Sequence, residues 1–98
     1  MRFEIILAPE AVEDLMLLRP HVRSVVKAAM ETHLRHEPAR TSRSRIKRLR
    51  GLARPQYRLR VGNDVRVFYD IVDATVEVLA IVAKSEAESW LKRFASPA

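Results

Sequence analysis

The stretch Tyr57-Arg-Leu-Arg-Val-Gly-Asn-Asp-Val-Arg-Val-Phe-Tyr-Asp-Ile-Val72 decides the fold of this sequence. Residues 56–61 alternate polar and apolar side chains, and residues 65–72 are rich in β-branched and aromatic ones; both patterns are typical of β-strands. Between them, Gly62-Asn63-Asp64 has the composition of a turn. The sequence therefore predicts a tight antiparallel pair of strands.

Further strands are predicted on both sides of this pair. After a turn at residues 73–75, residues 76–83 form another strongly apolar run, and residues 46–50 form a weaker strand that ends at Gly51. The two strong strands are apolar on both faces, so we expect them at the centre of the sheet. Near the N-terminus, residues 2–8 form a short leading strand.

Two helices are predicted between the leading strand and the sheet. The first begins at Pro9 and ends near Arg19, and the second begins at Pro20 and extends to about His36. Because only a proline junction separates them, we expect an antiparallel helical hairpin. Residues 37–45 form a polar loop.

A short C-terminal helix completes the chain. Ser85-Glu86-Ala87-Glu88 matches a capping box, which predicts the start of the helix, and Trp90 and Phe94 are spaced to pack it onto the domain. The elements together predict one α+β domain over residues 1–98. In it, the helical hairpin covers one face of a meander sheet with three to four antiparallel strands.

The composition excludes several classes of protein. The chain has no cysteine, which excludes disulfides, cysteine metal sites and thiol nucleophiles. The histidines show no recognised metal-binding spacing with a carboxylate in reach, so we expect no metal and no cofactor. No apolar run approaches a membrane span, and the first ten residues are too short and too acidic for a signal peptide. We therefore expect a cytoplasmic protein that does not contact membranes.

Positive charge is concentrated in one part of the chain. The formal net charge is +6, and residues 35–60 contain ten basic residues against the single acidic Glu37. The rest of the chain carries more acidic than basic residues. This polarity predicts a surface that binds a polyanion or an acidic partner.

Three arginines are the strongest candidates for an anion site. On a strand, Arg58 and Arg60 share one face about 7 Å apart. Arg66 follows across the turn, where we expect it to be a near cross-strand neighbour of Arg60. Such crowding of like charges favours anion binding, because a guanidinium matches a phosphate with two hydrogen bonds. The alternative is a solvated face whose charges have no role.

A second set of basic residues precedes these strands. Their spacing along a loop and a weak strand would allow them to follow a nucleic-acid backbone. The alternative is a flexible basic loop that serves solubility or an acidic partner. The candidate nucleic-acid-binding residues are Arg43, Arg45, Lys47, Arg48 and Arg50.

The segments together resemble the RelE/ParE superfamily of toxins from type II toxin–antitoxin systems. The resemblance rests on residues 46–51 (Ile-Lys-Arg-Leu-Arg-Gly), 57–62 (Tyr-Arg-Leu-Arg-Val-Gly), 65–71 (Val-Arg-Val-Phe-Tyr-Asp-Ile) and 76–82. The leading strand, the helical pair and the chain length match as well. The resemblance implies a RelE-like toxin that enters the ribosome, binds and cleaves mRNA, and so inhibits translation.

The resemblance also implies roles for individual residues. In RelE-type toxins the ribose 2′-hydroxyl attacks the adjacent phosphate, and basic residues on the sheet assist the reaction. The matching positions are Arg58, Arg60 and Arg66, and Lys84 after the last strand serves as acid or phosphate contact. These four are the predicted catalytic residues, and the candidates between residues 43 and 50 are predicted to bind RNA.

Departures from the family pattern leave two alternatives open. A guanidinium hardly deprotonates, and Ser85 and Trp90-Leu91 stand where RelE-type toxins often have a basic residue and a tyrosine or histidine. These departures favour a ParE-like toxin that inhibits DNA gyrase by binding, or a catalytically weakened protein that binds its antitoxin.

The expected partner is similar under all three interpretations. An acidic, apolar-anchored segment of a cognate antitoxin is expected to cover the basic surface, because the concentrated positive charge requires neutralisation. Operator DNA is an expected partner only of the toxin–antitoxin complex.

Overall fold

The computed structural model describes residues 1–98. In chain order its elements are β1 (Glu4–Leu7), α1 (Pro9–Leu17), α2 (Pro20–Leu34), β2 (Ile46–Arg48), β3 (Leu52–Arg54), β4 (Tyr57–Val61), β5 (Val65–Val72), β6 (Thr75–Ala83), α3 (Lys84–Phe94) and β7 (Ser96–Pro97). This order confirms the predicted α+β class. None of the helices has the length and hydrophobicity needed to cross a membrane.

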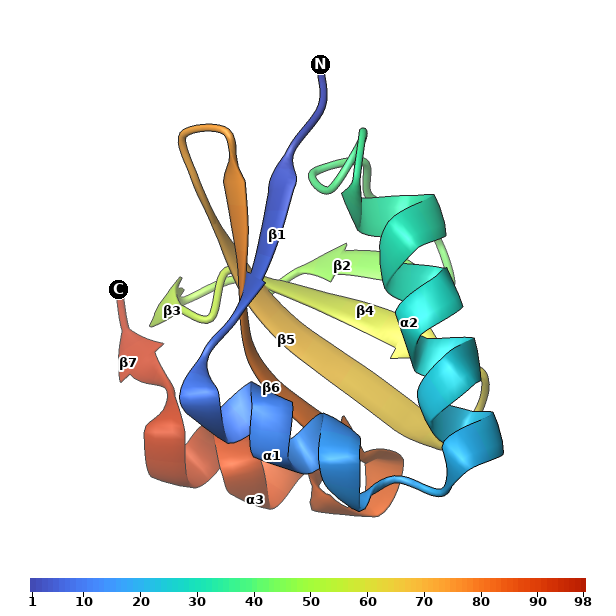
Figure 1. Ribbon diagram of the computed structural model, residues 1–98. Coiled ribbons are helices and arrows are strands. Elements are labelled where there is room, and N and C mark those ends of the chain that lie inside the picture. The colour runs from blue at the N-terminus through green and yellow to red at the C-terminus, as the bar shows by residue number, and fades with distance from the viewer.

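Five strands form the main sheet in the order β1-β6-β5-β4-β2 (Figure 1). The strands β6, β5, β4 and β2 are antiparallel neighbours, whereas β1 lies parallel to β6 at the edge. The predicted tight pair is present, with Val61 opposite Val65 across the turn. Both β5 and β6 lie inside the sheet, as their apolar side chains on both faces indicated.

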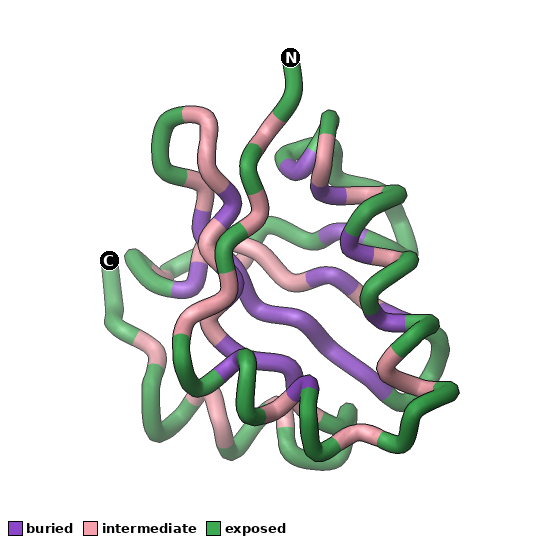
Figure 2. The backbone as a smooth tube through the Cα atoms, in the orientation of Figure 1, coloured by how far each residue is buried: buried purple, intermediate pink, exposed green.

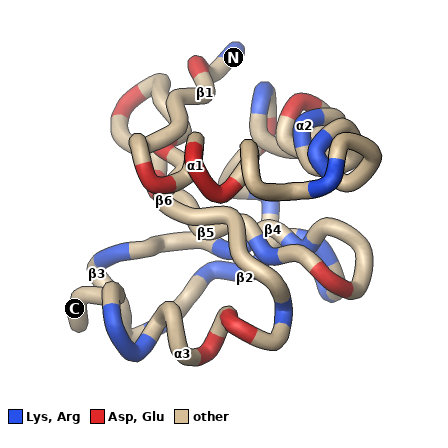
Figure 3. Tube along the Cα trace, turned by 60° about the horizontal axis from the view of Figure 1, so that its bottom comes forward, with Lys and Arg blue, Asp and Glu red and all other residues tan.

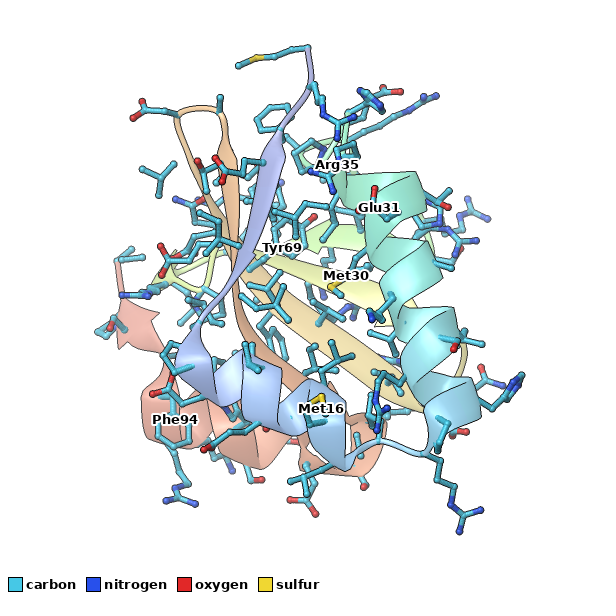
Figure 4. The ribbon with its side chains drawn as sticks, in the orientation of Figure 1. Met16, Met30, Glu31, Arg35, Tyr69 and Phe94 are labelled. Atoms are coloured by element: carbon cyan, nitrogen blue, oxygen red, sulfur yellow. The ribbon has the colours of Figure 1, made fainter.

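One face of the sheet carries the main hydrophobic core under α1 and α2 (Figure 2). Leu59 of β4 and Val67 and Tyr69 of β5 have no exposed surface, and Met30 of α2 belongs to the same cluster. Figure 4 shows Met30 and Tyr69 between α2 and the sheet. The Tyr69 hydroxyl donates to the carbonyl of Pro38 at 2.6 Å, which ties the loop after α2 to the core.

The third helix, α3, packs on the opposite face. Phe68 lies between the core residues Val67 and Tyr69 of β5, so its side chain points away from the main core. Its ring stacks on Trp90 of α3 with centroids 4.9 Å apart and planes at 5°. Because α3 contacts β5 and β6, it leaves the outer side of β4 and β2 accessible.

The two N-terminal helices cover different strands. The helix α1 packs on β6 and β1, and α2 packs on β4 (Figure 1). They therefore do not pack along each other as the predicted antiparallel hairpin would. Arg23 of α2 fixes their junction by donating to the carbonyls of Leu15 at 3.2 Å, Met16 at 2.9 Å and Leu18 at 3.0 Å. Carbonyls at a helix end lack partners within the helix, so Arg23 supplies donors that α1 requires.

Replacing Arg23 with alanine is expected to lower the free energy of unfolding by about 1–2 kcal/mol, because three carbonyls lose a charged donor. Arg19→Ala is the matched control, since Arg19 is exposed at the start of α2 and its side chain does not cap the helix. Urea denaturation compares the two variants. Equal unfolding midpoints would contradict the role of Arg23 at the junction.

Several boundaries differ from the sequence prediction. The helices α1 and α2 end at Leu17 and Leu34, two residues before their predicted ends. The predicted capping box is wrong, because α3 begins at Lys84 and no side chain caps it. The Lys84 N–H instead donates to the backbone carbonyl of Asp64 at 2.7 Å, so β6 continues directly into the helix.

The short strands β3 and β7 have no counterpart in the sequence prediction. They pair with each other in a separate two-stranded sheet, which brings the end of the chain beside the segment between β2 and β4. The strand predicted over residues 46–50 is also shorter, since β2 ends at Arg48.

Candidate functional site

Arg58, Arg60 and Arg66 come together on the sheet face opposite the main core. Arg58 and Arg60 flank the buried Leu59 on β4, so both point away from the core. Arg66 lies directly opposite Arg60 in the register of β4 and β5. This register confirms the expected cross-strand pair.

Three backbone and side-chain oxygens hold two of these like charges in place. Arg60 donates from Nε to the carbonyl of Gly62 at 3.1 Å and from Nη2 to Oδ1 of Asn63 at 2.6 Å. Arg66 donates from Nη1 to the carbonyl of Val65 at 2.9 Å and to that of Gly62 at 3.4 Å. The Gly62 carbonyl accepts from both arginines, and its partial negative charge reduces their mutual repulsion.

None of the three guanidinium groups forms an ion pair with a carboxylate. Arg66 is only 6% exposed, and Nε of Arg58 is buried without a hydrogen-bond partner. Burial lowers the pKa of Arg66, and the charges of Arg58 and Arg60 lower this pKa further, while Asp64 opposes the shift. Burial and the charge of Arg60 likewise lower the pKa of Arg58. Arginine starts so far above neutrality that these groups stay charged, and a bound anion would stabilise them.

Arg45 and Lys47 extend this cluster toward the edge of the sheet. Lys47 is paired with Arg58 in the register of β2 and β4, and the carbonyl of Arg45 accepts from the Arg60 N–H at 2.8 Å. Arg45, Lys47, Arg58, Arg60 and Arg66 are called the basic face below. Figure 3 shows lysine and arginine positions along β2, β4 and β5, whereas acidic positions mark α1 across the sheet.

Lys84 lies at the same end of the sheet as Arg60 and Arg66. It is the first residue of α3, and its backbone contact with Asp64 places it beside the start of β5. Its exposed side chain borders an open depression of about 400 Å³ with Asp64, Ala83 and Ser85. Lys84 therefore adds positive charge near this end of the basic face.

Solved toxin–antitoxin complexes contain chains with this arrangement of strands and helices. A chain of the RelBE2 complex from Mycobacterium tuberculosis is 25% identical, with a TM-score of 0.66 over 86% of this chain and 100% of that chain. A chain of the archaeal RelE-RelB complex from Pyrococcus horikoshii is 22% identical, with a TM-score of 0.69 over 86% and 97%. A chain of the DinJ-YafQ complex from E. coli is 15% identical, with a TM-score of 0.67 over 87% and 96%.

The chain has the RelE-like toxin fold. This finding confirms the resemblance that the strand pattern indicated. No protein-family model matches the sequence, and no curated protein matches it. The likeness is therefore carried by the arrangement of the backbone much more than by sequence identity.

The RelE-like sheet separates Arg48 from Lys47, although both were expected to follow one nucleic-acid backbone. Arg48 comes next on β2 and so points to the opposite face, where its guanidinium carbon lies 5.2 Å from the centre of the Tyr57 ring. Arg43 and Arg50 are exposed in the segments before and after β2. The RNA-binding role of all five candidates, Arg43, Arg45, Lys47, Arg48 and Arg50, stays a prediction.

A separate charged cluster lies farther along β5. Asp70 is 7% exposed, accepts from the Gln56 N–H at 2.7 Å and pairs with Nε of Arg54 at 3.2 Å. Arg54 also pairs with Glu77 at 2.7 Å. Burial raises the pKa of Asp70, while the Gln56 N–H and Arg54 lower it. Because the Asp70 charge is balanced within this cluster, it does not compete with an anion for the basic face.

Asn63 is a candidate that the sequence pattern did not single out. Its side-chain amide orients the Arg60 guanidinium, as described above. The sequence feature that could have identified Asn63 is its position in the turn directly after the strand that carries Arg58 and Arg60. Asparagine is common in turns for backbone reasons alone, so the position did not by itself indicate a role in the site.

The histidines do not join the basic face as metal ligands. No group of three or more histidine, aspartate or glutamate side chains is placed to hold a metal ion. His33 lies on α2, and burial, followed by the charge of Arg45, lowers its pKa.

Proposed function

We propose that the protein is the toxin of a type II toxin–antitoxin system and acts as a RelE-like, ribosome-dependent mRNA endonuclease. The observation that carries this proposal is the group of Arg58, Arg60 and Arg66, which lie on one face without a carboxylate partner. A guanidinium group binds phosphate, as it binds carboxylate, with two parallel hydrogen bonds. The fold shared with chains of RelE and YafQ complexes supports the toxin role.

In the proposed reaction, a ribose 2′-hydroxyl attacks the adjacent phosphorus. The new bond to the 2′-oxygen forms, the bond to the 5′-oxygen breaks, the hydroxyl proton passes to water, and the leaving oxygen gains a proton. Arg58, Arg60 and Arg66 stabilise the negative charge that develops on the phosphate, and such stabilisation is often the largest contribution to catalysis. Arginine does not accept a proton, so Lys84 is the proposed general acid or an additional phosphate contact.

The lack of a proton-accepting side chain among these arginines favours two alternative functions. A ParE-like toxin that inhibits DNA gyrase by binding needs no general base. A catalytically weakened protein that binds its antitoxin also needs none, and differs in being harmless when expressed alone.

Expression of the chain without an antitoxin separates these functions. We expect growth arrest, degraded messenger RNA and unchanged plasmid supercoiling. Arrest with intact messages and altered supercoiling, reproduced with purified gyrase, would support the ParE-like function. Normal growth with a folded, soluble chain would support the weakened protein.

The free toxin and the toxin–antitoxin complex are proposed to have different partners. The free toxin contacts the ribosome and mRNA through the basic face. In the inactive complex, an acidic, apolar-anchored antitoxin segment covers this face, and only that complex contacts operator DNA.

The toxin–antitoxin complex is expected to weaken with salt. Its dissociation constant should rise about tenfold between about 0.1 M and about 0.5 M salt, because screening weakens the attraction between the basic face and acidic side chains. Calorimetric titration over a salt series measures this change, and the double variant Lys47→Ala, Arg58→Gln should show a flatter dependence. A dissociation constant of the unmodified complex that does not change with salt would contradict an electrostatic interface.

A further inference from the structure

Arg60 also lines a polar depression at the edge of the sheet. This open hollow has a volume of about 330 Å³ and is lined by Ser44, Arg45, Arg60, Gly62 and Asn63, with no hydrophobic residue. Two of its five residues carry a guanidinium group, and none carries a carboxylate. This composition suits a small anion and not an apolar ligand.

The turn determines which edge of Arg60 is available in the hollow. Nε and Nη2 of Arg60 are occupied by the Gly62 carbonyl and by Asn63 Oδ1, which leaves Nη1 without a hydrogen bond to the protein. A guanidinium held in this way loses little freedom when it binds a further oxygen. Asn63 is therefore a positioning residue for Arg60.

Arg45 approaches the hollow from the neighbouring chain segment. Its carbonyl accepts from the Arg60 N–H at 2.8 Å, so the backbones of the two residues run side by side. The Arg45 side chain is exposed and forms no ion pair. Ser44 lines the same hollow, and a serine hydroxyl can serve as a neutral hydrogen-bond donor.

We propose that this hollow is a second phosphate subsite, in which Arg45, Ser44 and the free edge of Arg60 bind the phosphate next to the one that reacts. The inference rests on the proposed function for the identity of the polyanion, which is RNA. Arg60 borders both the hollow and the cluster with Arg58 and Arg66, because Arg66 lies opposite Arg60 across β4 and β5. The two subsites are therefore neighbours, as successive phosphates of one RNA chain are.

Arg45 and Arg2 provide a pair of variants for the test. Both side chains are exposed, and each alanine substitution removes one positive charge, but only Arg45 lines the hollow. The probe is a short, fluorescently labelled oligouridylate with 2′-O-methyl groups, which the proposed reaction cannot cleave. Fluorescence anisotropy over a salt series gives the affinity and its salt dependence.

Arg45→Ala is expected to weaken binding about five- to tenfold and to reduce the slope of log affinity against log salt by about 0.7, the value for one phosphate contact of a single strand. Arg2→Ala should weaken binding by less than about twofold. In the unmodified protein, addition of the probe should shift the nuclear magnetic resonance signals of the Nε–H groups of Arg45 and Arg60. Asn63→Ala should shift the Arg60 signal before any RNA is added, which shows the positioning contact directly.

Two results would overturn the inference and are distinguishable. Equal losses for Arg45→Ala and Arg2→Ala, with an unmoved Arg45 signal, would remove the subsite while RNA binding by the rest of the basic face stands. Failure of the unmodified protein to bind the probe even at low salt would overturn the subsite, whereas the proposed function is tested separately by cleavage of mRNA on the ribosome.

Discussion

Replacing Arg66 with alanine is expected to reduce mRNA cleavage about 100- to 1,000-fold, because a fixed cationic donor to the reacting phosphate is lost. Arg66 is held by the carbonyls of Val65 and Gly62, so its guanidinium is oriented before RNA binds. Such pre-orientation is what makes a donor effective in a transition state. Cleavage by purified toxin on ribosomes carrying mRNA measures the loss.

A second variant distinguishes a loss of cleavage from a loss of folded protein. Arg66 is largely buried, so alanine also removes packing, whereas Arg66→Met keeps most of the aliphatic volume and removes only the charged group. Arg66→Met should unfold at a temperature closer to that of the unmodified protein than Arg66→Ala does, and both variants should lose cleavage to a similar extent. Arg2→Ala, at the exposed N-terminus, is the control for a general loss of charge. Full activity in a folded Arg66→Met protein would remove Arg66 from the reaction.

Replacing Leu59 with alanine is expected to lower the free energy of unfolding by about 2–5 kcal/mol, because it empties a fully buried site in the core. This is a large part of the stability of a small domain. Leu59 lies between Arg58 and Arg60 on β4, so its packing also anchors the strand that carries the site. Chemical denaturation monitored by circular dichroism measures the loss.

Leu17→Ala is the matched control for this substitution. Leu17 is 86% exposed at the end of α1, so the same chemical change should alter stability by less than about 0.5 kcal/mol. A similar loss at both positions would contradict the placement of Leu59 in the core. Retained RNA binding by Leu59→Ala at low temperature would separate its structural role from that of its neighbours.

The strand pattern predicted the part of the fold that carries the basic face. Alternation placed Arg58 and Arg60 on one side of β4, and the short turn at residues 62–64 fixed the register that brings Arg66 opposite Arg60. These features depend on the alternation of side chains between the two faces of a strand. That alternation is visible in a single sequence as a period of two.

Features that depend on tertiary contacts could not be predicted in the same way. The capping box at Ser85 satisfied a local rule, but the partner of the first α3 N–H is a carbonyl of another chain segment. The strands β3 and β7 are too short to show a period, and they form only because they meet each other. Likewise, the partner that balances the charge of Asp70 is Arg54, which lies on a different strand.

The sequence predicted which residues supply positive charge to the site. It did not predict the sheet face on which all of them lie or how their side chains are held. The separation of Arg48 from Lys47 follows from alternation along β2, which the sequence prediction did not apply to these residues. The role of Asn63 depends on the direction that Arg60 takes beyond its Cβ atom, and this direction is set by the turn. Composition therefore predicts an anionic ligand, and the structure shows which arginine donors are held by the protein and which remain available.

The most direct test of the central claim is primer extension on one reporter mRNA after induction of the chain without antitoxin, with the unmodified protein beside Arg66→Ala. We expect new 5′ ends in phase with codons for the unmodified protein and none for the variant. New ends would establish cleavage on the ribosome and place Arg66 in the site. Growth arrest by the unmodified protein with an intact reporter would contradict the claim and would direct attention to a target that the basic face binds without cleaving.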